Sequence, residues 1–491
     1  MDSTEALRLV NRIYVRLNAR RPEIDIREQY FNGKQPLNYA TAEWKKENAS
    51  RYADFSDNWS APVVNAEAER IRYTGMKFKD NTAAANELRE HWLLNEMDMQ
   101  SSQGFVTSLT TARSFVIVWG DASTDEPIIS WEHPSTVEIE YDWEHLRKRK
   151  AALKTWVDEK LEYATLYTDD WVFKYQRDRT VIKLERESQA VQSRIIYATN
   201  GGWIPRISST EPWPLRNPMG EVPVVEIPNR PTLMGDPVSE IQGVIPMQDA
   251  INLLWAYLFL AADYASMDAR VVLGSAPPMI PILDGTGAKI GEKPADVKEL
   301  REKRLLYITD PNASIDSFKS ASLDVFTNTI SQMVGHIAAQ TRTPPTYLVS
   351  TVGMSNVNGE GLKASEIGVN KKVEEFQLFV SPAMREINRL IALAKGDQGL
   401  AKLVRLGSVQ WMNPEIRSDA QLADALQKMR AVGYPLEYIM ERDGLDEADI
   451  ERVLAMKQKE ADAATSFAAH DILNGAMNGD PNAGPPSVPA V

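Results

Sequence analysis

The sequence predicts an α+β protein, mainly helical, in which an antiparallel sheet separates two helical regions. Apolar residues recur at helical spacing over residues 4–30 and again from about residue 237 onward, which predicts long helices. Between these regions, residues 115–228 hold short runs rich in Val, Ile, Tyr and Thr that are separated by turns, the pattern of antiparallel strands. The 491 residues suffice for two to four domains.

The N-terminal region is expected to contain three helices. The first covers residues 4–30, where the apolar residues lie three to four positions apart. The second is expected over residues 59–76, beginning after Pro62 and stopping at Gly75. The third is expected over residues 84–112.

A helix expected over residues 237–267 has an unusual composition. Its second half is apolar nearly all round, which indicates burial on several sides, either within the chain or against other subunits. The most apolar run, residues 250–262, is too short to span a bilayer, and Asp249 and Asp263 bracket it. The sequence therefore predicts no membrane span.

The segments that follow alternate between strands, loops and helices. Residues 270–318 break into short strand-like pieces, and residues 321–342 are expected to form a helix that stops before two prolines. A loop rich in Gly, Asn and Ser precedes a long helix that runs to about residue 396. The apolar residues of this helix are expected on one face: Val373, Phe376, Val380, Met384, Ile387 and Ile391.

The C-terminal region is expected to divide into two parts. The sequence predicts a small helical unit over residues 418–460, in which Gly433 and Gly444 end helices. Residues 461–491 are rich in Gly, Pro and Asn toward their end, and we expect a flexible tail.

Composition excludes several kinds of chemistry. The chain has no cysteine, which excludes disulfides and thiolate catalysis. The five histidines are scattered and show no metal-ligand spacing, and no G-x-S-x-G motif is present. We therefore expect no catalytic residue, metal site or cofactor. The net charge of −13 disfavours non-specific binding of DNA.

The loop before the long helix only superficially resembles a phosphate-binding loop. Five residues separate Gly353 from Gly359, where the P-loop has four, and Glu360 stands where its lysine belongs. Lys363 and Ser365 are not adjacent, so the pattern favours a surface loop.

Several stretches occur in an order that is informative as a whole. They are YFNG followed by PL, WSAPVVNAEAERIRYTGM, GEVPVVEIPNRP, GDPVSEIQGVIPMQDAIN, and TPPTYL followed by SNVNGEGLKASE. Over roughly residues 10 to 460, these stretches and the order of elements resemble the portal proteins of tailed bacteriophages, the head–tail connectors. The resemblance is to the branch typical of phages of Gram-positive and actinobacterial hosts.

The resemblance implies a portal fold and a division of the chain into named parts. These are a wing of helices and antiparallel sheet over 1–236, a first stem helix over 237–268, a small α/β clip over 269–318, a second stem helix over 319–342, a wing return over 343–352, a tunnel loop and long tunnel helix over 353–397, the wing end and helical crown over 398–460, and the flexible tail over 461–491.

The resemblance also implies a function that is not enzymatic. A ring of about twelve subunits at one capsid vertex would form the channel for genome packaging and ejection. The implied partners are double-stranded DNA bound without sequence preference, the major capsid protein and scaffold, the terminase large subunit and a head–tail adaptor protein. The protein would reside in the virion after assembly in the host cytoplasm.

Three sets of residues follow from the resemblance. The tunnel loop that meets DNA would comprise Gly353, Met354, Ser355, Asn356, Val357, Asn358 and Gly359. The cations facing the channel would be Lys363, Lys371 and Lys372, although a solvated helix face explains them equally well. Packing between subunits in the stem would involve Leu254, Trp255, Leu258 and Phe259.

Two other functions stay open at this point. The first is a cytosolic multidomain enzyme that binds nucleotide through residues 353–365, which the loop spacing disfavours. The second is a monomeric structural adaptor or scaffold, which differs from a portal in subunit number.

Overall fold

A computed structural model provides the structure of the chain, in which short segments are left undescribed. The described residues are 1–35, 56–79, 81–120, 126–145, 148–158, 160–185, 194–266, 270–274, 276, 279–285, 287–294, 305–308, 310, 312, 322–348, 359–415, 419–443, 445 and 447–477.

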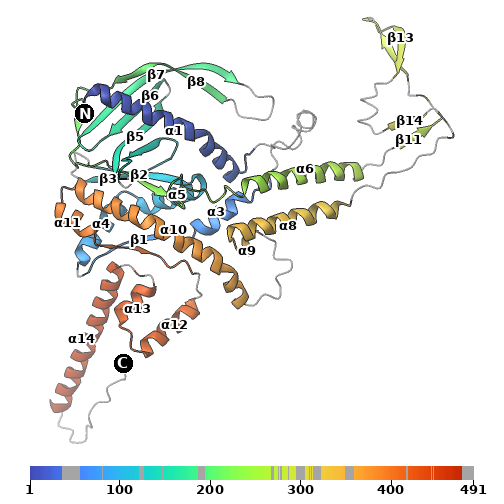
Figure 1. Cartoon of the computed structure of the whole chain (residues 1–491). Helices are drawn as coiled ribbons and strands as arrows, with labels where there is room; N and C mark the ends of the chain where they lie inside the picture. The colour runs from blue at the N-terminus through green and yellow to red at the C-terminus, as the bar shows by residue number, and fades with distance from the viewer. Residues whose placement is uncertain are drawn as a thin grey trace.

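The molecule has a large body from which two arms extend (Figure 1). The body contains the N-terminal helices and most of the strands. Helices α6 (Ile245–Ser266) and α8 (Leu323–Thr341) run side by side away from it, and short strands lie beyond their far ends. Three C-terminal helices form a separate unit on another side of the body. The predicted α+β class is confirmed.

One side of the body is a helix packed on a sheet. Helix α1 (Ser3–Phe31) begins at Asp2, whose carboxylate accepts the Glu5 N–H at 2.7 Å. Its apolar face packs on an antiparallel sheet through a cluster that includes Ile13, Leu153 and Phe173. The sheet comprises β4 (Val137–Tyr141), β5 (Arg149–Asp158), β6 (Leu161–Tyr167), β7 (Trp171–Glu185) and β8 (Arg194–Pro205), with β9 (Leu215–Arg216) paired to β7.

The other side of the body contains the main core. A three-stranded antiparallel sheet, β10 (Val224–Pro228), β2 (Arg113–Gly120) and β3 (Pro127–Glu132), packs with α5 (Met97–Thr111). Gly104 of α5 lies directly against the indole of Trp131, where any Cβ would overlap the ring. The predicted antiparallel region over residues 115–228 is therefore confirmed, although it forms two sheets.

Two N-terminal predictions need correction. The helix expected over 59–76 is only α3 (Ser60–Ala68), and the strand β1 (Tyr73–Lys77) follows it. This strand pairs with the distant β15 (Ser408–Trp411), a contact that local sequence spacing does not reveal. The helix expected over 84–112 is divided into α4 (Thr82–Leu94) and α5, because Glu96 takes a left-handed conformation with φ 54°.

The helix expected from residue 237 begins later than predicted. Residues 237–244 form turns that backbone hydrogen bonds fix to the body: the N–H of Val238 donates to the carbonyl of Asn229, and that of Glu240 to the carbonyl of Leu109. Helix α6 starts at Ile245 after these bonds. Helix α8 ends at Thr341, the next residue Arg342 has a φ of 53°, and the short α9 (Pro345–Leu348) follows.

The strands beyond the helical pair form two small sheets. Strand β11 (Arg270–Leu273) runs parallel to β14 (Leu305–Ile308), and β12 (Met279–Leu283) runs antiparallel to β13 (Lys289–Pro294). The expected strand-like character of residues 270–318 is confirmed for these ranges.

The long helix α10 (Gly359–Ala394) crosses the body and carries the predicted apolar face. All six predicted residues, from Val373 to Ile391, are buried in the main cluster. Helix α11 (Gln398–Val404) packs beside α10, and β15 follows.

The C-terminal unit is more helical than predicted. It contains α12 (Asp419–Ala431), α13 (Leu436–Asp443) and α14 (Glu447–Met477). The tail predicted to be flexible from residue 461 instead continues α14 to Met477, because residues 461–477 are rich in alanine and contain no proline. Residues 478–491 lie outside the described residues.

Candidate functional site

The start of α6 is tied to the body by a row of polar side chains. Residues 248, 252 and 255 share one face of the helix. The side-chain oxygen of Gln248 accepts the Trp59 N–H at 2.7 Å, and that of Asn252 accepts the Asp57 N–H at 3.1 Å. The Trp255 indole N–H donates to the Asp57 carboxylate at 2.7 Å. We call this row the α6 anchor.

A further contact reaches the α6 anchor from α1. The Tyr30 hydroxyl, which is buried, donates to Asp249 at 2.5 Å. The direction of α6 is therefore set by α1 and by the segment before α3. The sequence predictions did not identify this set, although polar residues in an otherwise apolar helix are a usable signal for buried hydrogen bonds.

The four residues predicted for packing between subunits already have contacts inside the chain. Leu254 and Trp255 pack against the main cluster, and the Trp255 ring stacks on Phe259 with centroids 5.6 Å apart. Leu258 is only 9% exposed. By contrast, Tyr257 on the same helix is 41% exposed and offers more surface to a neighbour.

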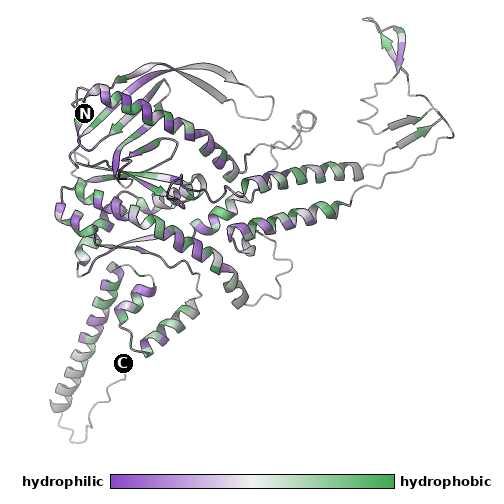
Figure 2. Ribbon diagram, viewed as in Figure 1, coloured by the Kyte–Doolittle hydropathy of each residue, from purple (hydrophilic) through white to green (hydrophobic). Residues whose placement is uncertain are grey.

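Many residues of α6 are nevertheless covered only in part by their own chain. Apolar residues recur along α6 outside the body (Figure 2). Over Ile245–Ala262 the helix is long and apolar enough to cross a membrane by length and composition alone, and 33% of that window is buried. The hydrogen bonds of the α6 anchor hold the first turns of α6 against the segment before α3. We therefore interpret α6 as a helix that packs against protein surfaces.

The residues predicted to meet DNA are only partly described. Residues 353–358 lie outside the described residues, and Gly359 is the first residue of α10. Lys363 lies in the first turns of α10, and its side chain is not among those described. Lys371 is exposed and pairs with Glu374 at 2.6 Å.

Lys372 does not lie on a surface, which corrects its assignment as a channel cation. Its side chain is 1% exposed, and its ammonium lies 2.9 Å from Glu67 and 2.8 Å from Glu240. The helical period turns Lys371 outward and Lys372 into the core, a difference that only the neighbouring elements determine.

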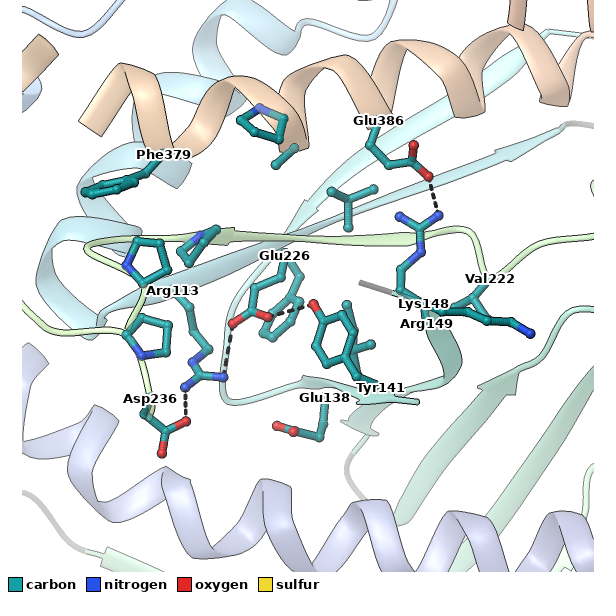
Figure 3. Close-up of a pocket in the computed structure, with 18 of the residues that line it drawn as sticks. Arg113, Glu138, Tyr141, Lys148, Arg149, Val222, Glu226, Asp236, Phe379 and Glu386 are labelled. Carbon is teal, nitrogen blue, oxygen red and sulfur yellow. Dashed lines mark hydrogen bonds and ion pairs between the residues drawn. The ribbon is translucent and has the colours of Figure 1, made fainter. Parts of the chain in front are cut away.

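A pocket of about 1540 Å³ lies between α10, β4 and the segment that follows β10 (Figure 3). Arg113 contacts Glu226 at 3.0 Å and also pairs with Asp236. The Tyr141 hydroxyl donates to Glu226 at 2.8 Å. Burial, with the nearby charge of Glu226, raises the pKa of Tyr141 well above its ordinary value. These paired groups join the sheets to the turn that precedes α6.

A second group of ion pairs closes the pocket on the α10 side. Glu386 pairs with Arg149 and, at 2.7 Å, with Arg389. Burial alone would raise the pKa of Glu386, but hydrogen bonds and charges from the two arginines outweigh it and lower that pKa. The pair with Arg149 connects β5 to α10. Among the described residues, no three His, Asp or Glu side chains are grouped to hold a metal ion.

Comparison with known proteins identifies relatives over most of the chain. The family model described as "Phage portal protein, SPP1 Gp6-like" matches residues 11–463. The "Portal protein" of Mycobacterium phage D29 is 26% identical over 414 residues, which cover 81% of this chain and 78% of that protein. The "Portal protein" of Mycobacterium phage L5 is 26% identical over 383 residues, covering 75% and 71%.

The comparison with solved structures gives a match with a low TM-score. It comes from "Neck of native GTA particle computed with C12 symmetry", with 10% sequence identity. The alignment covers 85% of this chain and 94% of that one, with a TM-score of 0.37, which is too low to support an argument.

Proposed function

This chain belongs to the family of phage portal proteins of the SPP1 Gp6-like type, and on that premise we propose that it forms a ring of about twelve subunits at one capsid vertex. The ring is the channel through which the genome is packaged and ejected. The family is structural and not enzymatic, so the nucleotide-binding alternative loses its support.

The observation that carries this proposal is the apolar surface of α6 that its own chain covers only in part. A helix that is apolar nearly all round needs partners on several sides. Within the chain, 33% of the residues of Ile245–Ala262 are buried and most of the others are half-buried, so a monomer leaves part of this apolar surface in contact with water. Copies of the same chain arranged head to tail around an axis would cover this surface in each subunit.

We propose the following assignment of portal parts to the chain. The body up to residue 236 is the wing, α6 and α8 are the stem, and strands β11 to β14 belong to the clip. In this proposal residues 343–352 are assigned to the wing return and residues 353–397 to the tunnel loop and tunnel helix, of which α10 is the described part. Residues 398–460 contain the wing end and the crown, and α14 extends the crown beyond residue 460 to Met477.

DNA would pass through the channel without being held. The net charge of −13 favours a wall that repels the phosphate backbone. Lys363 and Lys371 are the proposed cations near the tunnel loop. Because Lys371 pairs with Glu374, its attraction for a phosphate is reduced.

The proposed partners follow from the position at a vertex. They are the major capsid protein and scaffold at the wing, and the terminase large subunit and later a head–tail adaptor at the clip. The protein is a component of the virion, and we propose that it assembles in the host cytoplasm.

Substitution on α6 tests the proposal. Tyr257→Asp places a charge on the exposed side of the helix and should convert rings into smaller species on native mass spectrometry. Leu254 suits this test less well, because it packs within its own subunit. Tyr257→Phe and Val15→Asp, at a more exposed site on α1, should leave the rings intact. Unchanged rings in Tyr257→Asp would exclude this face of α6 from the contact between subunits.

A further inference from the structure

A buried cluster of charged side chains joins three elements that are distant in sequence. It consists of Lys372 on α10, Glu67 on α3 and Glu240 in the turns before α6, and we call it the Lys372 cluster. The ammonium lies 2.9 Å from a Glu67 oxygen and 2.8 Å from a Glu240 oxygen, and each side chain is at most 2% exposed. The cluster thus connects the long helix to the body and to the root of α6.

The two carboxylates of the Lys372 cluster have different surroundings. Glu240 also contacts Arg230 at 2.9 Å and accepts from the Asn229 side chain at 3.3 Å. The charged groups that act on Glu67 are Glu240, Lys372 and, at longer range, Arg230. The negative charge of Glu67 is therefore balanced by fewer nearby partners than the negative charge of Glu240.

The other neighbours of α3 bring little further charge to Glu67. Arg70, in the turn that follows α3, is directed toward Asn370 at 2.8 Å and Tyr347 at 3.2 Å. Apolar residues of α1 and α5, among them Tyr30 and Phe105, share one cluster with Val63 and Val64 of α3.

Stability alone does not explain the Lys372 cluster. Removing three charged groups from water is costly, and well-packed apolar residues in place of a buried ion pair are often as stable or more so. The position of the cluster is informative. Between residues 364 and 371 only Val369 is buried, and residues such as Ile367 and Lys371 are exposed, whereas buried residues become frequent from Lys372 onward, among them Val373 and Phe376. The cluster lies where α10 enters the core.

Protonation of Glu67 falls in an accessible pH range. Burial and the negative charge of Glu240 raise the pKa of Glu67 to about 7, against the opposing effect of Lys372. Two ionised carboxylates beside one buried ammonium repel each other, and a proton on Glu67 removes that repulsion.

We propose that the Lys372 cluster is a proton-operated latch: with Glu67 neutral it holds α10 against α3 and the root of α6, and ionisation of Glu67 weakens that hold. The latch acts within one subunit and does not depend on ring formation or on the portal function.

The direction of the pH effect follows from linkage. In an opened state where water reaches Glu67, its pKa returns to the ordinary value of 4.5. The extra stability of the closed state is complete below pH 4.5 and is lost as the pH rises through about 7. Between these values the equilibrium constant for opening rises up to about tenfold per pH unit.

Hydrogen exchange of the full-length protein, read by mass spectrometry and corrected for the intrinsic pH dependence of amide exchange, tests the latch. The equilibrium constant for opening of α3 and of the first half of α10 should rise at least about tenfold between about pH 5 and about pH 8. Peptides from the middle of α1 should show no such rise. Wild-type protein without this local rise would overturn the proposal.

Substitutions at the Lys372 cluster test whether the pH dependence of opening comes from Glu67. Glu67→Gln should abolish the pH dependence and keep the low opening of the protonated wild type. Glu374→Gln, at an exposed ion pair on the same helix, should behave like the wild type. If Glu67→Gln kept the wild-type dependence, the assignment would be wrong. Lys372→Met provides a second test that does not need Glu67→Gln to fold, because loss of the cation should move the transition to higher pH.

Discussion

The indole N–H of Trp255 donates to the carboxylate of Asp57 at 2.7 Å, across 198 positions of sequence. The same carboxylate oxygen accepts the indole N–H of Trp59 at 3.0 Å. Asp57 thus connects α6 to the segment that leads into α3. The orientation of the proposed stem relative to the wing depends on this acceptor.

Removal of this acceptor should destabilise the subunit. Asp57→Ala leaves two partly buried indole N–H groups without their partner and should lower the free energy of unfolding by about 1–3 kcal/mol. Asp57→Asn keeps a side-chain carbonyl that can accept a hydrogen bond, so its free energy of unfolding should fall by less than that of Asp57→Ala. Denaturant unfolding of the two variants measures the difference, and equal stability of Asp57→Ala and wild type would show that the contact contributes nothing.

Contact between Gly104 and Trp131 should make Gly104 intolerant of any side chain. The Trp131 indole is held in place by a hydrogen bond to Ser114 at 2.7 Å, so it cannot easily move away from an added Cβ. Gly104→Ala should lower the free energy of unfolding by about 1–3 kcal/mol despite the better helix propensity of alanine.

A matched control for Gly104→Ala lies in α8. Gly335 is exposed, and a Cβ there would meet nothing within 4 Å. Gly335→Ala should therefore be neutral or stabilising by up to about 1 kcal/mol. Thermal unfolding of both variants provides the comparison, and similar losses at both sites would argue against steric overlap as the cause.

Arg177 should be critical to the contact between α1 and the large sheet. Its guanidinium donates to buried Glu162 at 2.8 and 2.6 Å and lies between the rings of Tyr14 and Trp203, 4.4 and 4.0 Å from their centroids. Arg177→Met leaves a buried carboxylate with no cation and should cost about 3–5 kcal/mol.

A double-mutant cycle separates the charge effect at Arg177 from lost packing. Glu162→Gln in the Arg177→Met background removes the unpaired charge and should restore part of the stability. If the double variant is as unstable as the sum of the single variants, the two side chains are not energetically coupled.

Deletion of the proposed tunnel loop should affect DNA handling and leave assembly unchanged. We expect a chain lacking residues 354–359 to form normal rings, because the buried face of α10 begins later in the helix. Complementation of a portal-deficient phage should then yield fewer DNA-filled particles. A deletion of equal length at the C-terminus, residues 486–491, is the control. Normal packaging by the loop variant would exclude a working tunnel loop.

The parts of the fold that local spacing determines were predictable. The apolar spacing from Val373 to Ile391 requires one buried helical face, and all six residues are buried. The pairing of β1 with β15 was not predictable, because strands separated by more than 300 residues have no joint signal in one sequence. Asp57 was missed for the same reason, since its partners lie in a different part of the chain.

In the candidate site, the sequence alone does not show which of two neighbouring lysines is exposed. Lys371 and Lys372 are adjacent and chemically identical, yet one is exposed and the other is enclosed by two carboxylates. Their different surroundings come from α3 and the turns before α6, which the long helix meets only after folding. The apolar character of α6 was evident from composition, whereas the sides that its own chain covers were not.

Ring assembly is the central claim, and the mass and shape of the purified wild-type protein test it most directly. Native mass spectrometry with negative-stain electron microscopy should show closed rings of about twelve subunits with a central hole. A protein that remains monomeric at high concentration, and also in the presence of its capsid and scaffolding proteins, would contradict the account.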